Sequence, residues 1–292
     1  MKLKRLFDLA IKLGSERDPR PRKRAIKAYA DSAILWGDPG TEVRKILVGI
    51  DIEAAELLLA ERIREREGLD LVIGHHPEGA AYARLSEVMR IQVDLLCRAG
   101  LERGAAEKFM DRRRLEVERR ILPQNHTRPV DAARLLRMPF ACLHTPADNH
   151  VYGFLRETFQ RRKPRTVQEI IDILLSLPEY RQAQQHNAGP RVVLGSPRRP
   201  AGKIILEMTG GTEGPKEALD KLSKSGAATL VSMHLSEEYF QKAKDANLNA
   251  VIAGHISSDA LGLNLLLDRI EKASGERFQT ISCSGFTRIR RN

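Results

Sequence analysis

Short apolar segments alternate along the chain with longer segments in which apolar residues recur at helical spacing. Residues 45–52 (KILVGIDI) predict a strand, and residues 53–67 carry apolar positions among charges, as expected of a helix that covers a sheet. Residues 69–74 (LDLVIG) predict the next strand. This strand–helix–strand order is typical of an α/β protein with a largely parallel sheet.

Predicted strands and helices continue to alternate after a long charged segment. Residues 80–137 have a helical period and predict a helical insertion, in which Gly100 and Gly104 mark a break between two helices. Thr166 and Glu169 predict a capping box at the start of a later helix. The later elements that the pattern predicts are strands at 139–143, 191–195, 203–209, 228–233, 249–254 and 277–283, and helices at 149–162, 166–177, 215–226, 237–246 and 258–272.

A segment rich in Gln, Pro, Gly and Arg, residues 178–202, divides the chain into two parts. We expect a first α/β half at 1–177, with the insertion at about 80–137, then a linker region at 178–202, and a second α/β half at 203–292. The predicted fold class is therefore α/β, with two βα-repeating halves and largely parallel sheets.

Histidines follow the predicted strands. Of the eight histidines, five stand at the downstream end of an apolar run, and these are His75, His76, His144, His234 and His255. A single histidine in such a place is more often a structural residue, but these come from four separate segments. The carboxyl ends of parallel strands meet at one edge, where α/β proteins bind ligands. The pattern therefore favours a site there.

Carboxylates accompany two of these histidines. Asp148 comes four residues after His144, and Asp259 comes four residues after His255. A mixture of imidazole nitrogen and carboxylate oxygen suits zinc, manganese or iron, whereas calcium takes oxygen ligands. The sequence predicts a metal site at the strand ends, between the two halves.

Three blocks of the sequence resemble those of a known family. The blocks ILVGIDI…LDLVIGHHPEG, LHTPAD and VIAGHISSD are similar to the His-His-Pro, His-Thr-x-x-Asp and Gly-His-x-x-x-Glu segments of the NGG-interacting-factor-like proteins. These proteins are also called dinuclear-metal-centre proteins or type 2 GTP cyclohydrolase homologues. The resemblance implies two divalent ions (Zn, Fe or Mn), with His75 and His76 each holding one, Asp148 as a carboxylate ligand, and His255 with Asp259 completing the site. Asp259 stands where the family has glutamate, which shortens the reach by one methylene.

Other polar residues near these segments could act on a substrate. His144, which the resemblance places beside the metals, and His234 are candidates for general acid or base, because an unligated imidazole titrates near neutral pH. Alternatively, they orient a metal ligand. The loop at 209–215 (TGGTEGP) could offer backbone N–H groups to an anion, or it is a plain tight turn. The candidate substrate-binding residues are Thr145, Gly210, Gly211 and Thr212.

Composition limits the class of protein. The formal charge of +11 raises the question of nucleic acid, but the arginines are scattered and aromatic residues make up only 5%, without interleaving. The charge also suits a small anionic substrate.

Cys97, Cys142 and Cys283 lie far apart and are odd in number, which argues against disulfides. No signal peptide or apolar run of about 18 residues is visible, so we expect a cytoplasmic protein without a membrane segment.

Three functions stay open. The first is a dinuclear metal-dependent hydrolase that cleaves a small anionic compound, such as a purine nucleotide, with a metal-activated water. The second is a metal-binding interaction protein or metallochaperone without turnover. The third is a nucleic-acid-binding protein, which rests on charge alone. The family resemblance also implies a homo-oligomer, often a hexamer.

Overall fold

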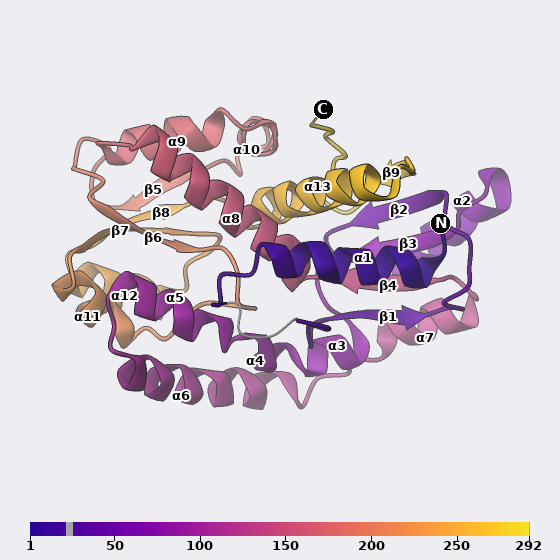
Figure 1. Cartoon of the computed structure of the whole chain (residues 1–292), viewed down its shortest axis with the longest axis horizontal. Helices are drawn as coiled ribbons and strands as arrows, with labels where there is room; N and C mark the ends of the chain where they lie inside the picture. The colour runs from indigo at the N-terminus through magenta and orange to yellow at the C-terminus, as the bar shows by residue number, and fades with distance from the viewer. Residues whose placement is uncertain (22–25, 292) are drawn as a thin grey trace.

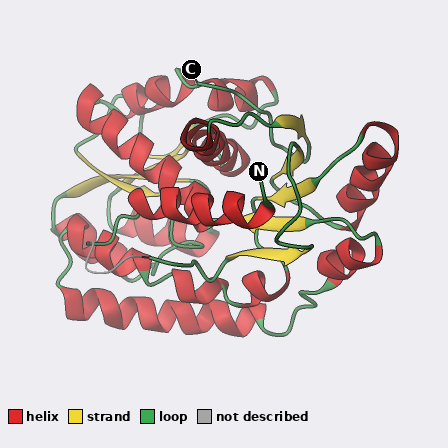
Figure 2. Ribbon diagram, turned by 45° about the vertical axis from the view of Figure 1, so that its right-hand side comes forward, coloured by secondary structure: helices red, strands yellow, loops and turns green. Residues whose placement is uncertain are grey.

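The structure of the chain is a computed structural model that describes residues 1–21 and 26–291. Helices lie around two β-sheets, as Figures 1 and 2 show. The strands are β1 (Ser32–Trp36), β2 (Lys45–Gly49), β3 (Leu71–Gly74), β4 (Phe140–Leu143), β5 (Arg191–Leu194), β6 (Lys203–Glu207), β7 (Ala227–Ser232), β8 (Asn249–Ile252) and β9 (Gln279–Ser282). The helices are α1 (Leu3–Glu16), α2 (Ala54–Glu67), α3 (Gly79–Ala83), α4 (Leu85–Val88), α5 (Ile91–Ala99), α6 (Arg103–Ile121), α7 (Arg128–Leu135), α8 (Thr145–Arg162), α9 (Val167–Leu175), α10 (Pro178–Gln185), α11 (Ala218–Lys224), α12 (Glu237–Asp245) and α13 (His255–Ser274).

The first sheet has the strand order β1-β4-β3-β2-β9. Strands β2, β3, β4 and β9 run parallel, and β1 pairs antiparallel with β4. Every residue of β3 and β4 is buried. Parallel strands with both faces covered are nearly continuous apolar runs, which is why the sequence predicted them.

The second sheet has the order β5-β8-β7-β6, with β6, β7 and β8 parallel and β5 antiparallel to β8. The two largely parallel sheets confirm the predicted fold class. The last strand, however, does not lie in the half of the chain to which the sequence pattern assigned it. Strand β9, assigned to the second half, pairs with β2 of the first sheet. Helix α13 has 20 residues and so spans about 30 Å, which is long enough to carry the chain from one sheet to the other.

Helices α8 and α13 pack against each other between the sheets (Figure 1). Their backbones approach closely, because a Cβ atom on Gly262 would lie 2.6 Å from the carbonyl oxygen of Ala147. Both helices begin earlier than predicted, so that His144 is the N-cap of α8 and His255 is the first residue of α13. This places Asp148 and Asp259 one turn into their helices.

Residues 79–135 form the predicted helical insertion, α3 to α7. Met89 and Met110 of the insertion share one hydrophobic core with Leu219 and Tyr239, which belong to the second half of the chain. The insertion therefore packs against the helices of the second sheet. Helix α1 and strand β1 were not predicted, and α10 lies within the segment expected to be a linker.

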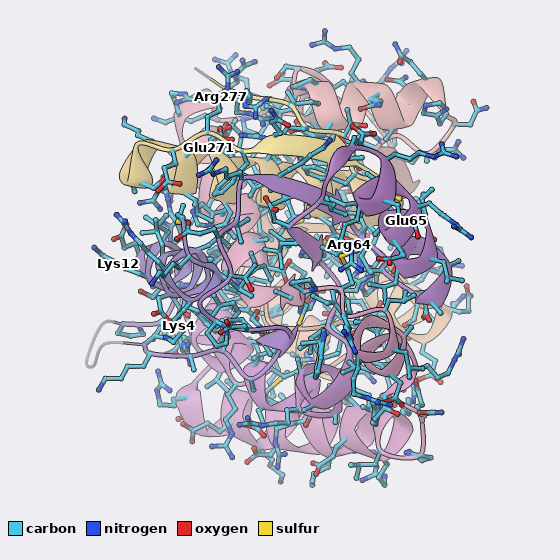
Figure 3. The ribbon with its side chains drawn as sticks, turned by 90° about the vertical axis from the view of Figure 1, so that its right-hand side faces the viewer. Lys4, Lys12, Arg64, Glu65, Glu271 and Arg277 are labelled. Carbon is cyan, nitrogen blue, oxygen red and sulfur yellow. The ribbon has the colours of Figure 1, made fainter. Side chains whose placement is uncertain are left out.

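Charged side chains cover the outer helices (Figure 3). Many of the basic groups lie beside acids on the same helix. Arg114 pairs with Glu118 at 3.0 Å, and Arg120 pairs with Glu116 at 2.8 Å, both along α6. Such pairs are typical of a solvated helix face. Among the described residues, no helix is both long and apolar enough to cross a membrane.

Candidate metal centre

Strands of both sheets bring five histidines together. His75 and His76 follow β3, His144 follows β4, His234 follows β7 and His255 follows β8. The ring centroids of His75 and His144 are 4.9 Å apart, those of His76 and His255 are 5.0 Å apart, and those of His234 and His255 are 5.0 Å apart. The predicted meeting of strand ends therefore involves the two sheets together.

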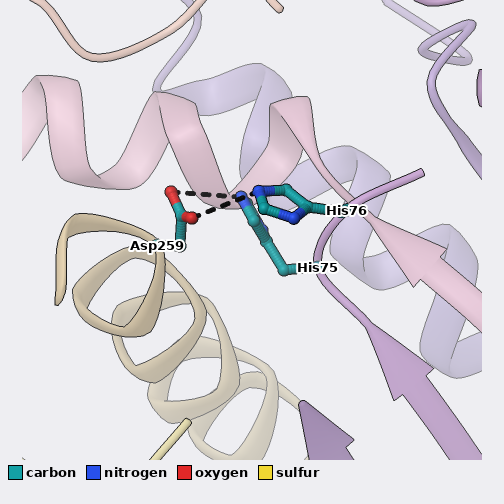
Figure 4. Close-up of side chains that lie close together, drawn as sticks. All are labelled: His75, His76 and Asp259. Carbon is teal, nitrogen blue, oxygen red and sulfur yellow. Dashed lines mark ion pairs between the residues drawn. The ribbon is translucent and has the colours of Figure 1, made fainter. Parts of the chain in front are cut away.

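Two carboxylates lie among these rings. The Oδ1 atom of Asp259 is 3.4 Å from Nε2 of His75, while its Oδ2 atom is 3.4 Å from Nε2 of His76 (Figure 4). The same Oδ2 atom is 3.5 Å from Nε2 of His255. Asp148 presents its Oδ1 atom to Nε2 of His75 at 3.3 Å. Because residues four apart lie on one helix face, each aspartate is directed to the same place as the histidine that precedes it.

These donor atoms fit a transition-metal ion. Within the described part of the chain, both ring nitrogens of His75, Oδ1 of Asp148 and both oxygens of Asp259 are buried and make no hydrogen bond. A buried carboxylate without a partner is costly, so the arrangement favours a cation. Donors about 2.1 Å from a tetrahedral ion lie roughly 3.4 Å from one another, which matches the separations above.

Two sets of donors could each hold a metal ion. The first consists of His75, His76 and Asp259, and the second consists of His75, His144 and Asp148. His75 belongs to both sets. His144 therefore lies within donor distance, although the sequence assigned it to proton transfer rather than to metal binding.

The pKa values of the side chains also indicate that the site favours positive charge. Burial acts to lower the pKa of His75, but the Asp259 and Asp148 carboxylates raise it to about 10. Burial also acts to lower the pKa of His76, which Asp259 and Asp51 raise to about 9. Burial acts to raise the pKa of Asp259, but His75 and its neighbours hold it well below its usual range. The carboxylates thus favour positive charge beside them, which protonated His75 and His76 supply without a metal and which a divalent ion could supply instead.

Two further carboxylates, which the sequence pattern did not predict, hold the histidines in place. Asp31 lies 2.8 Å from Nδ1 of His144, and Asp51 lies 2.6 Å from Nδ1 of His76. A carboxylate on Nδ1 fixes the tautomer that leaves Nε2 free for a metal. Asp51 follows β2 closely, as His75 follows β3, so its place near a strand end was a usable signal. Asp31 precedes a strand that the pattern did not predict.

His234 lies at the outer edge of the cluster. Its side chain is 42% exposed, and its Nδ1 atom is 3.9 Å from Oε1 of Glu213. Glu213 is buried and accepts hydrogen bonds from the backbone N–H and the hydroxyl of Ser236, each at 2.6 Å. His234 contacts His255 but belongs to neither donor set.

The candidate substrate-binding residues lie in two places. The hydroxyl of Thr145 is buried and donates to Asp31 at 2.6 Å. In the loop at 209–215, Gln92 of the insertion donates to the carbonyl oxygens of Gly210 at 2.8 Å and Thr212 at 2.5 Å. Gly211 and Thr212 also line a cavity of about 30 Å³ together with Asp148, His234 and Asp259. A space of that size holds one or two water molecules beside the donors.

Comparison with solved structures finds similar chains. The NIF3 superfamily protein from Sphaerobacter thermophilus is 28% identical, over 97% of this chain and 98% of that chain, with a TM-score of 0.79. Reduced HcgD from Methanocaldococcus jannaschii is 16% identical over 97% of each chain, with a TM-score of 0.56. A Bacillus cereus protein related to NIF3 is 10% identical over 100% of this chain and 98% of that chain, with a TM-score of 0.53. The last two show a shared fold. No protein-family model matches the sequence, and no curated protein is significantly similar to it.

Proposed function

The chain belongs to the NIF3 superfamily, and from this premise we propose that it is a hydrolase that uses two divalent transition-metal ions to cleave a small anionic compound. The family resemblance in the sequence is thereby confirmed, while the reaction is our inference. The observation that carries it is the pair of donor sets that share His75. The Nε2 atom of His75 can bind only one ion, so Asp259, whose two oxygens face His75 and His76, would be the residue that keeps a second ion close to the first.

The proposed reaction needs metal ligands, residues that position those ligands, and a residue that transfers a proton. Two divalent ions held by these donor sets would lower the pKa of a bound water and stabilise the oxygens of a hydrolytic step. Asp31 and Asp51 hold His144 and His76 with Nε2 toward the donors. His234 is partly exposed and beside the cavity, so it can exchange a proton between a substrate and solvent.

The substrate class rests on charge. The chain carries a formal charge of +11, which favours an anionic compound over a cationic one. A purine nucleotide is the specific substrate that we propose from the family resemblance. We also propose a homo-oligomer, with the hexamer as the expected form, and size-exclusion chromatography with light scattering measures it directly.

A metal-binding protein without turnover is the second candidate, because the same donors serve it equally well. The test is turnover of a panel of nucleotides, phosphate esters and cyclic amides by protein loaded with Zn, Mn or Fe. We expect hydrolysis of at least one anionic compound, which Asp259→Asn abolishes. Full metal loading without turnover of any compound would instead support the metallochaperone.

A further inference from the structure

A second, larger cavity lies beside the metal centre. It has a volume of about 300 Å³ and lies between α5 of the insertion, α8, and β6, the edge strand of the second sheet. We call it the side cavity. Its lining includes Leu95 and Leu96 of α5, Tyr152 and Arg156 of α8, and Lys203 and Ile205 of β6. Its volume is at the lower end of the range for small-molecule sites, about 300–1,000 Å³.

The side cavity shares a wall with the metal centre. Glu207 and Thr209 line both the side cavity and the 30 Å³ cavity beside the donors. The Thr209 hydroxyl donates to Asn149 at 2.8 Å, and Asn149 follows Asp148 directly. A molecule in the side cavity would therefore have one end next to the metal donors.

Glu207 is the acidic residue of this shared wall. Its Oε1 atom accepts a hydrogen bond from the Tyr239 hydroxyl. Its Oε2 atom is buried and has no hydrogen-bond partner among the described residues. A buried oxygen in that state can accept a hydrogen bond from a ligand without first breaking another one.

The side cavity is also lined by three cationic side chains, beside the neutral amides of Gln92 and Gln160. Arg98, Arg156 and Lys203 line it, and Glu207 is the one acid among its lining residues. The Nε atom of Arg156 is buried and makes no hydrogen bond in the described part of the chain. Lys203 donates to the carbonyl oxygen of Ala99 at 2.6 Å, which leaves two of its three donors. Guanidinium groups bind phosphate and carboxylate through bidentate hydrogen bonds.

The inner surface is apolar. Leu96 and Ile205 are buried, and Tyr152 is 6% exposed with its ring 5.7 Å from the guanidinium carbon of Arg156. A ligand that satisfies both surfaces has an apolar or aromatic body and one acidic group.

We propose that the side cavity binds an organic anion, a phosphate monoester or carboxylate with an apolar or aromatic body, and that the inserted helix α5 is one of its walls. Arg156 binds the acidic group, and Leu96, Ile205 and Tyr152 contact the body. This gives the insertion a role in choosing the substrate. The identification of the ligand as the substrate rests on the proposed hydrolase function, whereas its binding does not.

The test is an NMR titration of the metal-loaded full chain with three probes that share an aromatic body: phenyl phosphate, phenylacetate and neutral 2-phenylethanol. We expect the anions to bind at least about tenfold more tightly than the neutral probe. The phosphate and carboxylate arms separate the two acidic groups. Arg156→Ala should weaken anion binding at least about tenfold, with metal content and melting temperature unchanged. Arg161→Ala, an exposed position on the same helix, is the matched control.

A second variant tests the cavity independently of charge. Ala99 lines the side cavity, so Ala99→Trp should fill it and weaken binding of all three probes. Equal affinity of Arg156→Ala and Arg161→Ala for the anions, or of Ala99→Trp and the unaltered protein, would overturn the proposal. Anion binding that both Arg156→Ala and Ala99→Trp weaken supports the side cavity even if the panel of compounds shows no turnover, in which case only the hydrolase proposal fails.

Discussion

The Oδ2 atom of Asp31 lies 2.8 Å from Nδ1 of His144, although the two residues are 113 positions apart in the sequence. Strand pairing explains the contact. Strands β1 and β4 are antiparallel, and Ser32 is paired with Leu143. The residue before one strand therefore lies beside the residue after the other, and Nε2 of His144 is left facing Asp148, 3.7 Å from its Oδ2 atom.

Asp31→Asn should weaken metal binding about 10–100-fold, because a carboxylate on the second nitrogen of a histidine raises its basicity as a ligand. The measurement is a competition titration of metal against a chromogenic chelator. Asp111→Asn, at an exposed position on α6, is the control and should bind metal as the unaltered protein does. If Asp31→Asn also retained full affinity, His144 would not be a ligand held by Asp31.

The second prediction concerns stoichiometry. Purified protein, after loading, should contain about two transition-metal ions per chain, because two donor sets are present. A chelator should lower the melting temperature, since ions that bind only the folded state stabilise it. Elemental analysis and thermal unfolding measure the two effects. One ion per chain at saturation would mean that the two donor sets bind a single ion between them.

Asp259→Asn should lower metal content and abolish the stabilisation by metal. Asp259 is the fifth residue of α13, whose N-cap is Gly254, so it does not cap the helix. Its two oxygens instead face His75 and His76. Asp220→Asn, whose aspartate is 65% exposed on α11, is the control. If chelation destabilised Asp259→Asn as much as the unaltered protein, this carboxylate would not be a metal ligand.

The central strands and the histidines at their ends could be predicted because buried parallel strands are continuous apolar runs. Strand β1 could not be predicted in the same way. Its sequence, SAILW, is short and becomes more exposed toward Trp36, at the edge of the sheet. Missing β1 meant missing Asp31. The position of β9 was also out of reach, because nothing local in Gln279–Ser282 reveals that α13 leads back to the first sheet.

The fourth prediction tests how α8 and α13 position the two aspartates. In Gly262→Ala, the new Cβ atom would lie 2.6 Å from the carbonyl oxygen of Ala147, so the helices must separate. We expect a loss of about 1–3 kcal/mol in the free energy of unfolding, with weaker metal binding because Asp148 and Asp259 move apart. Denaturant unfolding and metal titration check this. The control is Gly153→Ala, whose Cβ atom would be 3.4 Å from Arg17, an ordinary contact.

The last prediction uses Glu207, whose pKa burial raises from 4.5 to about 7. Because its pKa is raised in the folded state, protonated Glu207 contributes to the free energy of unfolding in full below pH 4.5, and this contribution is lost as the pH rises through 7. Glutamine cannot ionise. The free energy of unfolding of Glu207→Gln, compared with that of the unaltered protein, should therefore rise by on the order of 1–3 kcal/mol from pH 5.5 to pH 8. Urea unfolding at both pH values measures this difference. Glu271→Gln is the control, because Arg290 and its neighbours outweigh burial and lower the pKa of Glu271, so its difference should stay constant. A constant difference for Glu207→Gln as well would mean that Glu207 is ionised in the folded protein already at pH 5.5.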